Sequence, residues 1–141
     1  MKTSTLILVL ALVGCGSNPV ETPWTGSYEG SLRTQMQGSP NPDVADTTEA
    51  FTLFVDSYQG STYVKTDFGC TLVFVPKSDT EAVALPVSCS VKGTWTTQDW
   101  AFSSATMTRV NGKVTFKAEA VLTFSDGSAP VTATYTFTET K

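Results

Sequence analysis

The sequence contains no histidine among its 141 residues. This absence removes the Ser-His-Asp and Cys-His catalytic arrangements, and it also removes a common ligand of zinc. Glycine-rich phosphate-binding loops of the P-loop or dinucleotide type do not occur either. We therefore identify no catalytic residue, no metal site and no cofactor motif, and we expect a protein that is not an enzyme.

Basic residues are also few, with nine Lys and Arg against thirteen Asp and Glu and a net charge of −4. An acidic domain does not accumulate on phosphate backbones, so nucleic acid is not an expected partner. The acidic residues Asp43, Asp46 and Glu49 lie close together in the sequence, which leaves a weak calcium site as an alternative to a solvated loop.

Long hydrophobic runs are limited to one, at residues 6–13 (LILVLALV). It is too short to span a bilayer as a helix, which takes roughly 20 apolar residues. Lys2 precedes it, as in a secretory signal. The run ends in Leu12-Val13-Gly14-Cys15, which resembles the lipobox of bacterial lipoproteins at all four positions. An ordinary secreted protein with a cysteine in its signal is the alternative.

The lipobox resemblance implies that residues 1–14 are a cleaved signal peptide and that Cys15 is lipidated, so the exported protein is anchored to a bacterial membrane. In lipoproteins of the enterobacterial type, Asp after the lipidated cysteine retains the protein at the inner membrane, so Gly16 implies the outer membrane. Residues 15–23 then form the lipidated cysteine and a polar tether, and residues 24–141 form a single domain.

Only three cysteines are present, and lipidation of Cys15 leaves Cys70 and Cys89 as a pair. Disulfides are the default for such a pair in an exported protein. The expected strand register also predicts a disulfide between Cys70 and Cys89. If residues 77–82 close a hairpin that pairs Phe74 with Leu85, Cys70 lies directly opposite Cys89.

Threonine, valine and aromatic residues dominate the rest, and apolar residues alternate with a period of two, which predicts β-strands. Asn111-Gly112 and Asp126-Gly127 favour two-residue type I′ turns. Hairpins at these dipeptides give a three-stranded meander. Its expected inward pairs are Met107–Phe116, Ala105–Ala118, Phe116–Phe137, Ala118–Tyr135, Ala120–Ala133 and Leu122–Val131.

The remaining strands are expected at residues 24–32, 51–57, 61–67, 70–76 and 82–92. A polar loop is expected at 37–49 and a turn region at 95–100. About eight antiparallel strands joined by short turns predict an all-β, up-and-down barrel, in which closure removes exposed strand edges. A β-sandwich of the same strands is the alternative.

The first expected strand reads Trp24-Thr-Gly26-Ser-Tyr28-Glu-Gly30. This W-x-G-x-Y-x-G pattern resembles the first strand of lipocalin-like (calycin) barrels, although the usual G-x-W order is absent. The resemblance implies a barrel that carries a lipid, a pigment or another small apolar molecule, and it assigns no residue to a ligand. Gly26 and Gly30 fall on the inward face, where glycine allows a sharp bend or a close backbone approach.

Small residues on the inward face form a band, here called the alanine band with its two glycines. This band either lines a ligand cavity or receives large side chains from the opposite wall, because an eight-stranded barrel has room for side chains or for one small ligand. Its members are Gly26, Gly30, Ala105, Ala118, Ala120 and Ala133.

Three functions follow as hypotheses. The first is a non-enzymatic envelope lipoprotein that binds a small apolar molecule inside the barrel or an envelope protein outside it. The second is a structural or inhibitory envelope protein with a filled core. The third is a hydrolase that uses two carboxylates from distant strands.

Overall fold

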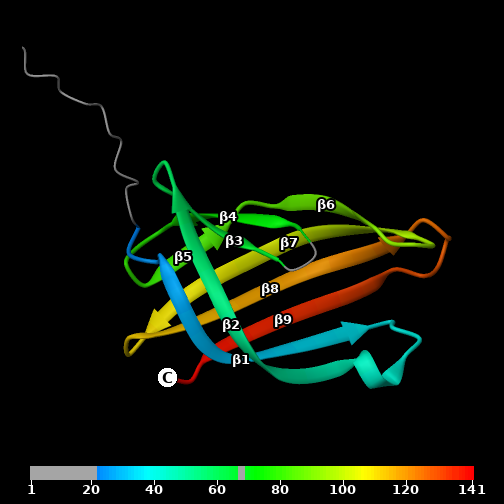
Figure 1. Cartoon of the computed structure of the whole chain (residues 1–141), viewed down its shortest axis with the longest axis horizontal. Helices are drawn as coiled ribbons and strands as arrows, with labels where there is room; N and C mark the ends of the chain where they lie inside the picture. The colour runs from blue at the N-terminus through cyan, green and yellow to red at the C-terminus, as the bar shows by residue number, and fades with distance from the viewer. Residues whose placement is uncertain (1–21, 67–68) are drawn as a thin grey trace, which may run out of the picture.

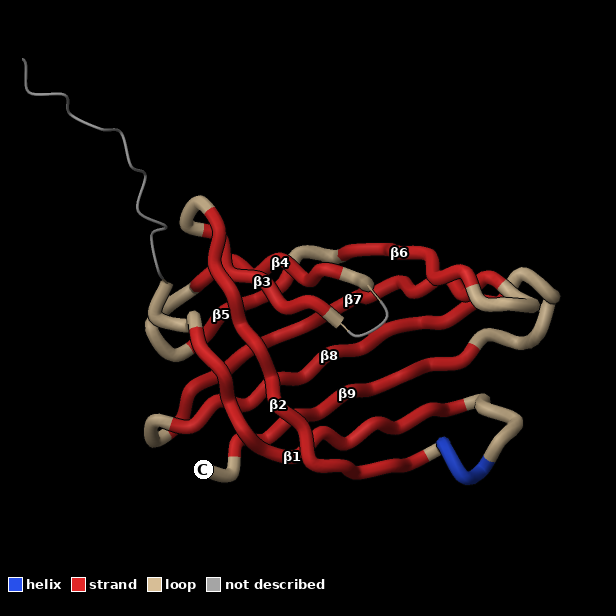
Figure 2. Tube along the Cα trace, in the orientation of Figure 1, coloured by secondary structure: helices blue, strands red, loops and turns tan. Residues whose placement is uncertain are grey.

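The computed structural model describes residues 22–66 and 69–141, so the signal peptide, Cys15 and most of the tether lie outside the described residues. Within the described ranges, no helix is long and apolar enough to cross a membrane. The prediction of an all-β fold is confirmed, because apart from one short 3-10 helix every described element is a strand (Figures 1 and 2).

The described elements run in the following order along the chain: β1 (Gly26–Gln37), the 3-10 helix η1 (Pro42–Val44), β2 (Asp46–Tyr58), β3 (Ser61–Lys65), β4 (Thr71–Pro76), β5 (Glu81–Ala84), β6 (Val87–Lys92), β7 (Thr97–Val110), β8 (Lys113–Phe124) and β9 (Val131–Glu139). The predicted loop at 37–49 is shorter than expected, because β2 begins at Asp46.

All strand pairs are antiparallel, and they follow the order β5-β4-β3-β2-β1-β9-β8-β7-β6. Additional pairing of β5 with β7 closes an eight-stranded barrel and leaves β6 as an extra strand that pairs with β7. The predicted up-and-down barrel is therefore confirmed, and the sandwich is not formed.

Strand length divides the barrel into two halves. Strands β3, β4 and β5 have 5, 6 and 4 residues, whereas β1, β2, β7 and β8 have at least 12 each. Strand β2 pairs with β3 only through Val55–Tyr58, so its residues 46–54 have β1 as their strand partner. The wall is consequently complete only at the end that the short strands reach.

The C-terminal meander has the register that the turn dipeptides predict. All six expected inward pairs occur, among them Ala120 with Ala133 and Phe116 with Phe137. Asn111 and Gly112 have φ angles of 53° and 79°, as a type I′ turn requires. At the second turn only Gly127 has a positive φ, so the register is as predicted although the turn is of another type.

The predicted register of the β4–β5 hairpin is wrong by one residue. Phe74 pairs with Ala84 instead of Leu85, and Pro76 pairs with Ala82 instead of Val83. The physical reason is burial, because Ala82 and Ala84 face the core while Leu85 is 56% exposed. The expected strand at 82–92 is also broken, since Leu85 and Pro86 separate β5 from β6.

Two neighbouring irregularities change which residues face inward. The inward face passes from Ala84 to Val87 across the break between β5 and β6. In β7, a bulge at Ser103 keeps both Phe102 and Ala105 inside. Val87 pairs with Phe102, so the break between β5 and β6 lies beside the bulge in β7. The hydrogen-bonded pairing along β7 therefore continues past both irregularities.

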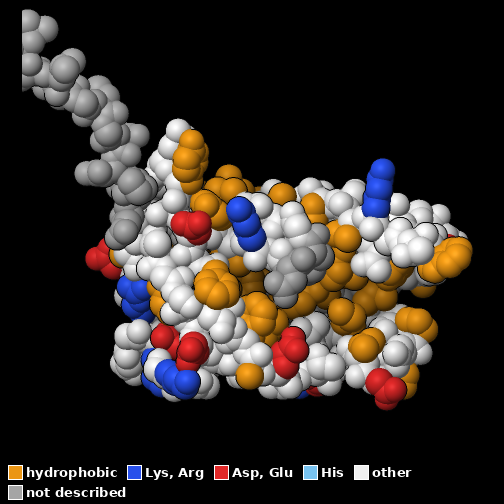
Figure 3. Space-filling model, viewed as in Figure 1, with side chains coloured by type: hydrophobic (Ala, Val, Ile, Leu, Met, Phe, Trp, Pro, Cys, Tyr) orange, Lys and Arg blue, Asp and Glu red, His pale blue; other side chains and the backbone are white. Residues whose placement is uncertain are grey.

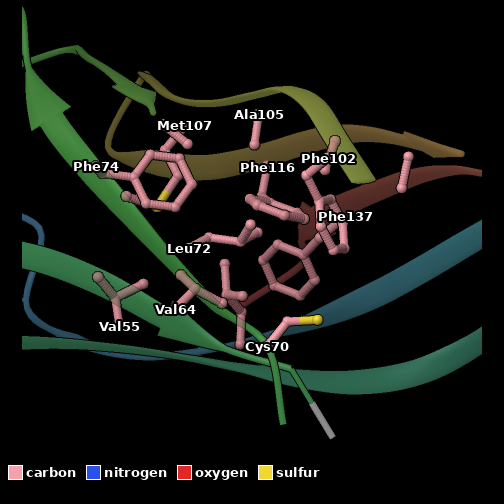
Figure 4. Close-up of a cluster of buried hydrophobic side chains, with 14 of the residues drawn as sticks. Val55, Val64, Cys70, Leu72, Phe74, Phe102, Ala105, Met107, Phe116 and Phe137 are labelled. Carbon is pink, nitrogen blue, oxygen red and sulfur yellow. The ribbon is translucent and has the colours of Figure 1, made fainter. Parts of the chain in front are cut away.

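The end reached by the short strands is here called the packed end, and its buried side chains Val55, Phe74 and Met107 belong to the core cluster drawn in Figure 4. Arg109 covers the packed end. Its Nη2 donates to the Pro23 carbonyl at 2.8 Å, and its guanidinium lies 5.0 Å from the centre of the Trp24 ring. Tyr28 donates its hydroxyl to the Trp24 carbonyl at 2.7 Å. The packed end buries Trp24, Phe74, Met107 and Val114 to at most 1% exposure, and Val55 to 3%.

Gly30 allows the close backbone approach that its inward position predicts. It pairs with Phe51 on one side and Glu139 on the other. A Cβ at this position would overlap the carbonyl oxygen of Thr138. No side chain therefore fits where β1 passes β9.

Candidate ligand-binding cleft

The other end of the barrel, here called the open end, contains a cleft with a volume of about 550 Å³. It lies where β2 continues beyond the end of β3, and apolar side chains are visible in the hollowed surface there (Figure 3). The volume is within the range of small-molecule sites, which are also concave and mostly apolar. Its lining residues are Leu32, Thr34, Met36, Glu49, Phe51, Thr52, Leu53, Phe54, Val64, Lys65, Thr66, Leu72, Trp100, Phe102, Phe116, Tyr135 and Phe137.

Three aromatic rings form one surface of the cleft, here called the aromatic platform: Trp100, Phe102 and Tyr135. Their centroids are 6.2 to 6.4 Å apart, and their planes differ by 17° to 34°. Trp100 and Phe102 come from β7 and Tyr135 comes from β9, so the rings meet across β8.

The alanine band explains how these rings fit. Ala118 pairs with Tyr135, and Ala120 pairs with Phe102, so small residues occupy β8 between the two ring-bearing strands. All four alanines of the band are at most 2% exposed, and none of them lines the cleft. The four alanines are therefore buried in the sheet among the ring-bearing strands and do not form the wall of the cleft.

The two glycines predicted beside this band lie elsewhere. Gly26 is exposed at the start of β1, where an added Cβ would touch the Tyr28 ring. Gly30 borders a smaller surface depression with Glu29 and Lys141 instead of the aromatic cleft. Neither glycine lies among the residues that line the cleft.

Polar groups in the cleft are few. Burial raises the pKa of the Tyr135 phenol, so this group stays protonated and neutral near neutral pH. Glu49 and Lys65 are exposed and contribute one charge of each sign to the lining. Thr34, on β1, lies opposite Tyr135 and adds a hydroxyl group. The lining therefore combines a small number of hydrogen-bonding groups with a mainly apolar surface.

The predicted disulfide between Cys70 and Cys89 is present, with the two Cα atoms 5.7 Å apart. The predicted hairpin register, in which Phe74 pairs with Leu85, is not formed. The break at Leu85–Pro86 shifts the chain by the one residue that brings Cys89 opposite Cys70. Cys70 immediately precedes β4, and Cys89 lies in β6, whose strand partner within the described part of the chain is β7. The bond therefore holds the extra strand against the barrel beside the cleft.

The acidic residues considered for calcium do not gather into one site. Asp46 forms an ion pair with Arg33 at 2.6 Å, which lowers the pKa of the carboxyl group. Glu49 lies at the cleft, whereas Asp43 belongs to the 3-10 helix. Among residues 22–66 and 69–141, no group of three or more acidic or cysteine side chains is placed to hold a metal ion.

Sequence reasoning missed the main feature of the site, because it placed Trp100 in a turn region. Trp100 lies in β7 and is 6% exposed, while Trp95, at the tip of the β6–β7 hairpin, is 93% exposed. A signal was available, because Trp100 and Phe102 alternate with each other but are out of phase with Ala105 and Met107. Such a phase change is what a β-bulge produces.

Comparisons with known proteins add little to this geometry. No protein-family model and no curated protein matches the sequence. Among solved structures, the ywiB protein from Bacillus subtilis is similar with a TM-score of 0.40 and 10% identity. The similarity covers 82% of this chain and 92% of that one.

Proposed function

We propose that this chain is an exported, lipid-anchored envelope protein whose barrel binds a small apolar molecule in the cleft. The observation that supports ligand binding is the cleft itself: about 550 Å³ lined mainly by aromatic and aliphatic side chains. Burying such a surface against a ligand yields roughly 25 cal/mol per Å² of apolar area removed from water. The non-enzymatic reading fits a site with one neutral phenol and two exposed, opposite charges.

Anchoring is supported by the lipobox-like residues before Cys15, together with the absence of another free cysteine once Cys70 and Cys89 are joined. We expect Cys15→Ser to yield protein without an acyl group, found in the soluble fraction or left unprocessed. Mass spectrometry of the N-terminal peptide checks this. An unacylated N-terminal cysteine in the wild type would contradict the proposed anchoring.

Ligand binding is tested by extracting the protein natively from its host and recording its mass under non-denaturing conditions. We expect an additional apolar small molecule that dissociates on unfolding. The matched control is Thr34→Phe, which places a ring inside the cleft and should be recovered without the extra mass. Equal ligand content in both proteins would place the bound molecule elsewhere.

A second candidate is protein binding by strand addition. Among the described residues, positions 46–54 of β2 pair only with β1 and β6 pairs only with β7, so these two edges favour it. Unpaired edges are templates for another strand. Amide hydrogen exchange tests this: slower exchange confined to 46–54 or 87–92 in the native extract would support a bound strand, and unchanged exchange would exclude it.

A further inference from the structure

A charged side chain lies at the mouth of the cleft without a counter-ion. Glu49 alternates with Phe51 and Leu53 on the inner face of β2, and it pairs with Leu32 of β1. All four residues line the cleft, and Glu49 is exposed. Among residues 22–66 and 69–141, its carboxylate has no hydrogen-bonding partner and no ion-pair partner. A ligand that enters the cleft therefore meets an unpaired negative charge beside an apolar surface.

On the neighbouring strand β1, the arginine is already paired with another carboxylate. Arg33 alternates with Leu32 and Thr34, which line the cleft, so it lies on the outer face of β1. There its guanidinium donates two hydrogen bonds to the carboxylate of Asp46, at 2.9 and 2.6 Å. Asp46 therefore lies outside with its cation, whereas Glu49 remains on the inner face.

Lys65 is a basic residue that borders the cleft, but its ammonium group lies on the outer surface. Its neighbour Val64 is the buried residue of this part of β3, at 4% exposure, so Lys65 shares the opposite face with Tyr63. The Lys65 Nζ lies 5.6 Å from the centre of the Tyr63 ring, and the Tyr63 hydroxyl donates to Asp56 at 2.9 Å. Of the two charged residues that line the cleft in the described part of the chain, Glu49 is thus the one that faces inward.

From this placement we infer that the cleft prefers apolar ligands that carry a positive charge, such as an alkyl- or arylammonium ion, with Glu49 as the counter-ion. The inference rests on the proposed function and narrows it. Phe51 favours the same charge, because it is partly exposed beside Glu49 and the face of an aromatic ring attracts cations. The apolar part of the ligand occupies the cleft, and its ammonium group stays at the solvent-exposed mouth.

The test compares three probes that share one ring system and differ in charge: anthracen-2-ylmethylammonium, anthracen-2-ylmethanol and anthracene-2-carboxylate. Each is titrated with the mature protein near neutral pH in about 0.1 M salt and is followed by its own fluorescence. We expect the ammonium ion to bind roughly 2- to 25-fold more tightly than the carboxylate, with the alcohol between them. The reason is that an exposed ion pair adds modestly to affinity, while two like charges reduce it by a similar factor.

Two variants locate the charge that is responsible. Glu49→Gln keeps the size of the side chain and removes its charge, so it should weaken binding of the ammonium ion roughly 2- to 5-fold. Binding of the alcohol should change less than about 1.5-fold, which also verifies that the variant is folded. Glu81→Gln is the matched control, because it makes the same change in net charge at an exposed position of β5, at the packed end. It should change binding of each probe less than about 1.5-fold, since salt screens exposed charges beyond a Debye length.

Equal or tighter binding of the carboxylate than of the ammonium ion by the wild type would overturn the cation inference and leave the proposed binding function intact. A preference that persists in Glu49→Gln, or that Glu81→Gln reduces as much, would also overturn it, because the net charge of the protein would then be the cause. Failure of all three probes to bind would count against the inference and against the proposed function together.

Discussion

The packed end and the open end of the barrel are built from the same long strands, yet one is solid and the other is hollow. At the packed end β3, β4 and β5 complete the wall, and Trp24 and Phe74 are at most 1% exposed. At the open end the short strands are missing, and the rings of β7 and β9 border a cleft. The difference shows that strand length, more than composition, decides where this barrel has a cavity.

The largest difference between the two ends should appear in stability. Phe74→Ala removes a ring that is 1% exposed and lies edge-on to Phe116, so we expect a loss of about 3–5 kcal/mol. Phe51→Ala, at the cleft, should cost only about 1–2 kcal/mol, because this ring is partly exposed already. Urea unfolding of both variants measures the contrast. Similar losses would mean that the open end is packed as tightly as the other.

Removing the disulfide should have the next largest effect. Cys70 and Cys89 are separated by 19 positions, and a closed loop of this length contributes on the order of 3 kcal/mol in the chain-entropy model. In the Cys70→Ala/Cys89→Ala double variant we also expect faster amide exchange in β6, since β7 is then its main attachment. Exchange within β3 and β5 should change little. Equal acceleration at both ends would show that the bond supports the whole barrel and not β6 in particular.

Side-chain enlargement should have opposite consequences at a cleft position and in the alanine band. Thr34→Phe places a ring in the cleft, so it should abolish binding of an apolar probe and change stability by less than about 1 kcal/mol. Ala133→Leu, at a fully buried position, should cost about 1–3 kcal/mol through overpacking. Probe titration and thermal unfolding of both variants separate these outcomes. Loss of stability in Thr34→Phe without loss of binding would contradict the position of the cleft.

The smallest expected effect concerns alkaline pH. Burial raises the pKa of Tyr135 in the folded protein above its unfolded value of about 10. The contribution of this group to stability is therefore complete below about pH 10 and is lost as the pH rises toward the folded pKa. Tyr135→Phe should flatten this part of the stability–pH curve. An identical alkaline decline in the variant would assign the effect to other tyrosines.

The sequence was sufficient for the parts of the fold in which turn chemistry and alternation agree. Asn111-Gly112 fixes the β7–β8 hairpin, and the inward series of β8 and β9 then admits one register. The Cys70–Cys89 disulfide was also predictable from the cysteine count. The hairpin register offered in its support was wrong by one residue, because Ala82 and Ala84 face the core in place of Val83 and Leu85.

The cleft was not predictable in the same way, because it depends on where neighbouring strands stop. Alternation shows which residues of β2 face inward, but it does not show that β3 ends at Lys65 and that, among the described strands, residues 46–54 pair with β1 alone. The alanine band did not point to the cleft, because all four alanines are buried and none of them is among its lining residues.

Methyl NMR of the mature protein during titration with anthracene-2-carboxylate tests the central claim most directly. Leu32, Met36 and Leu53 line the cleft, whereas Val55, Met107 and Val114 belong to the packed end. We expect saturable shifts of the first group through aromatic ring currents, with little change in the second. Shifts spread over both groups, or confined to the packed end, would contradict the claim that this barrel is solid at one end and ready to bind at the other.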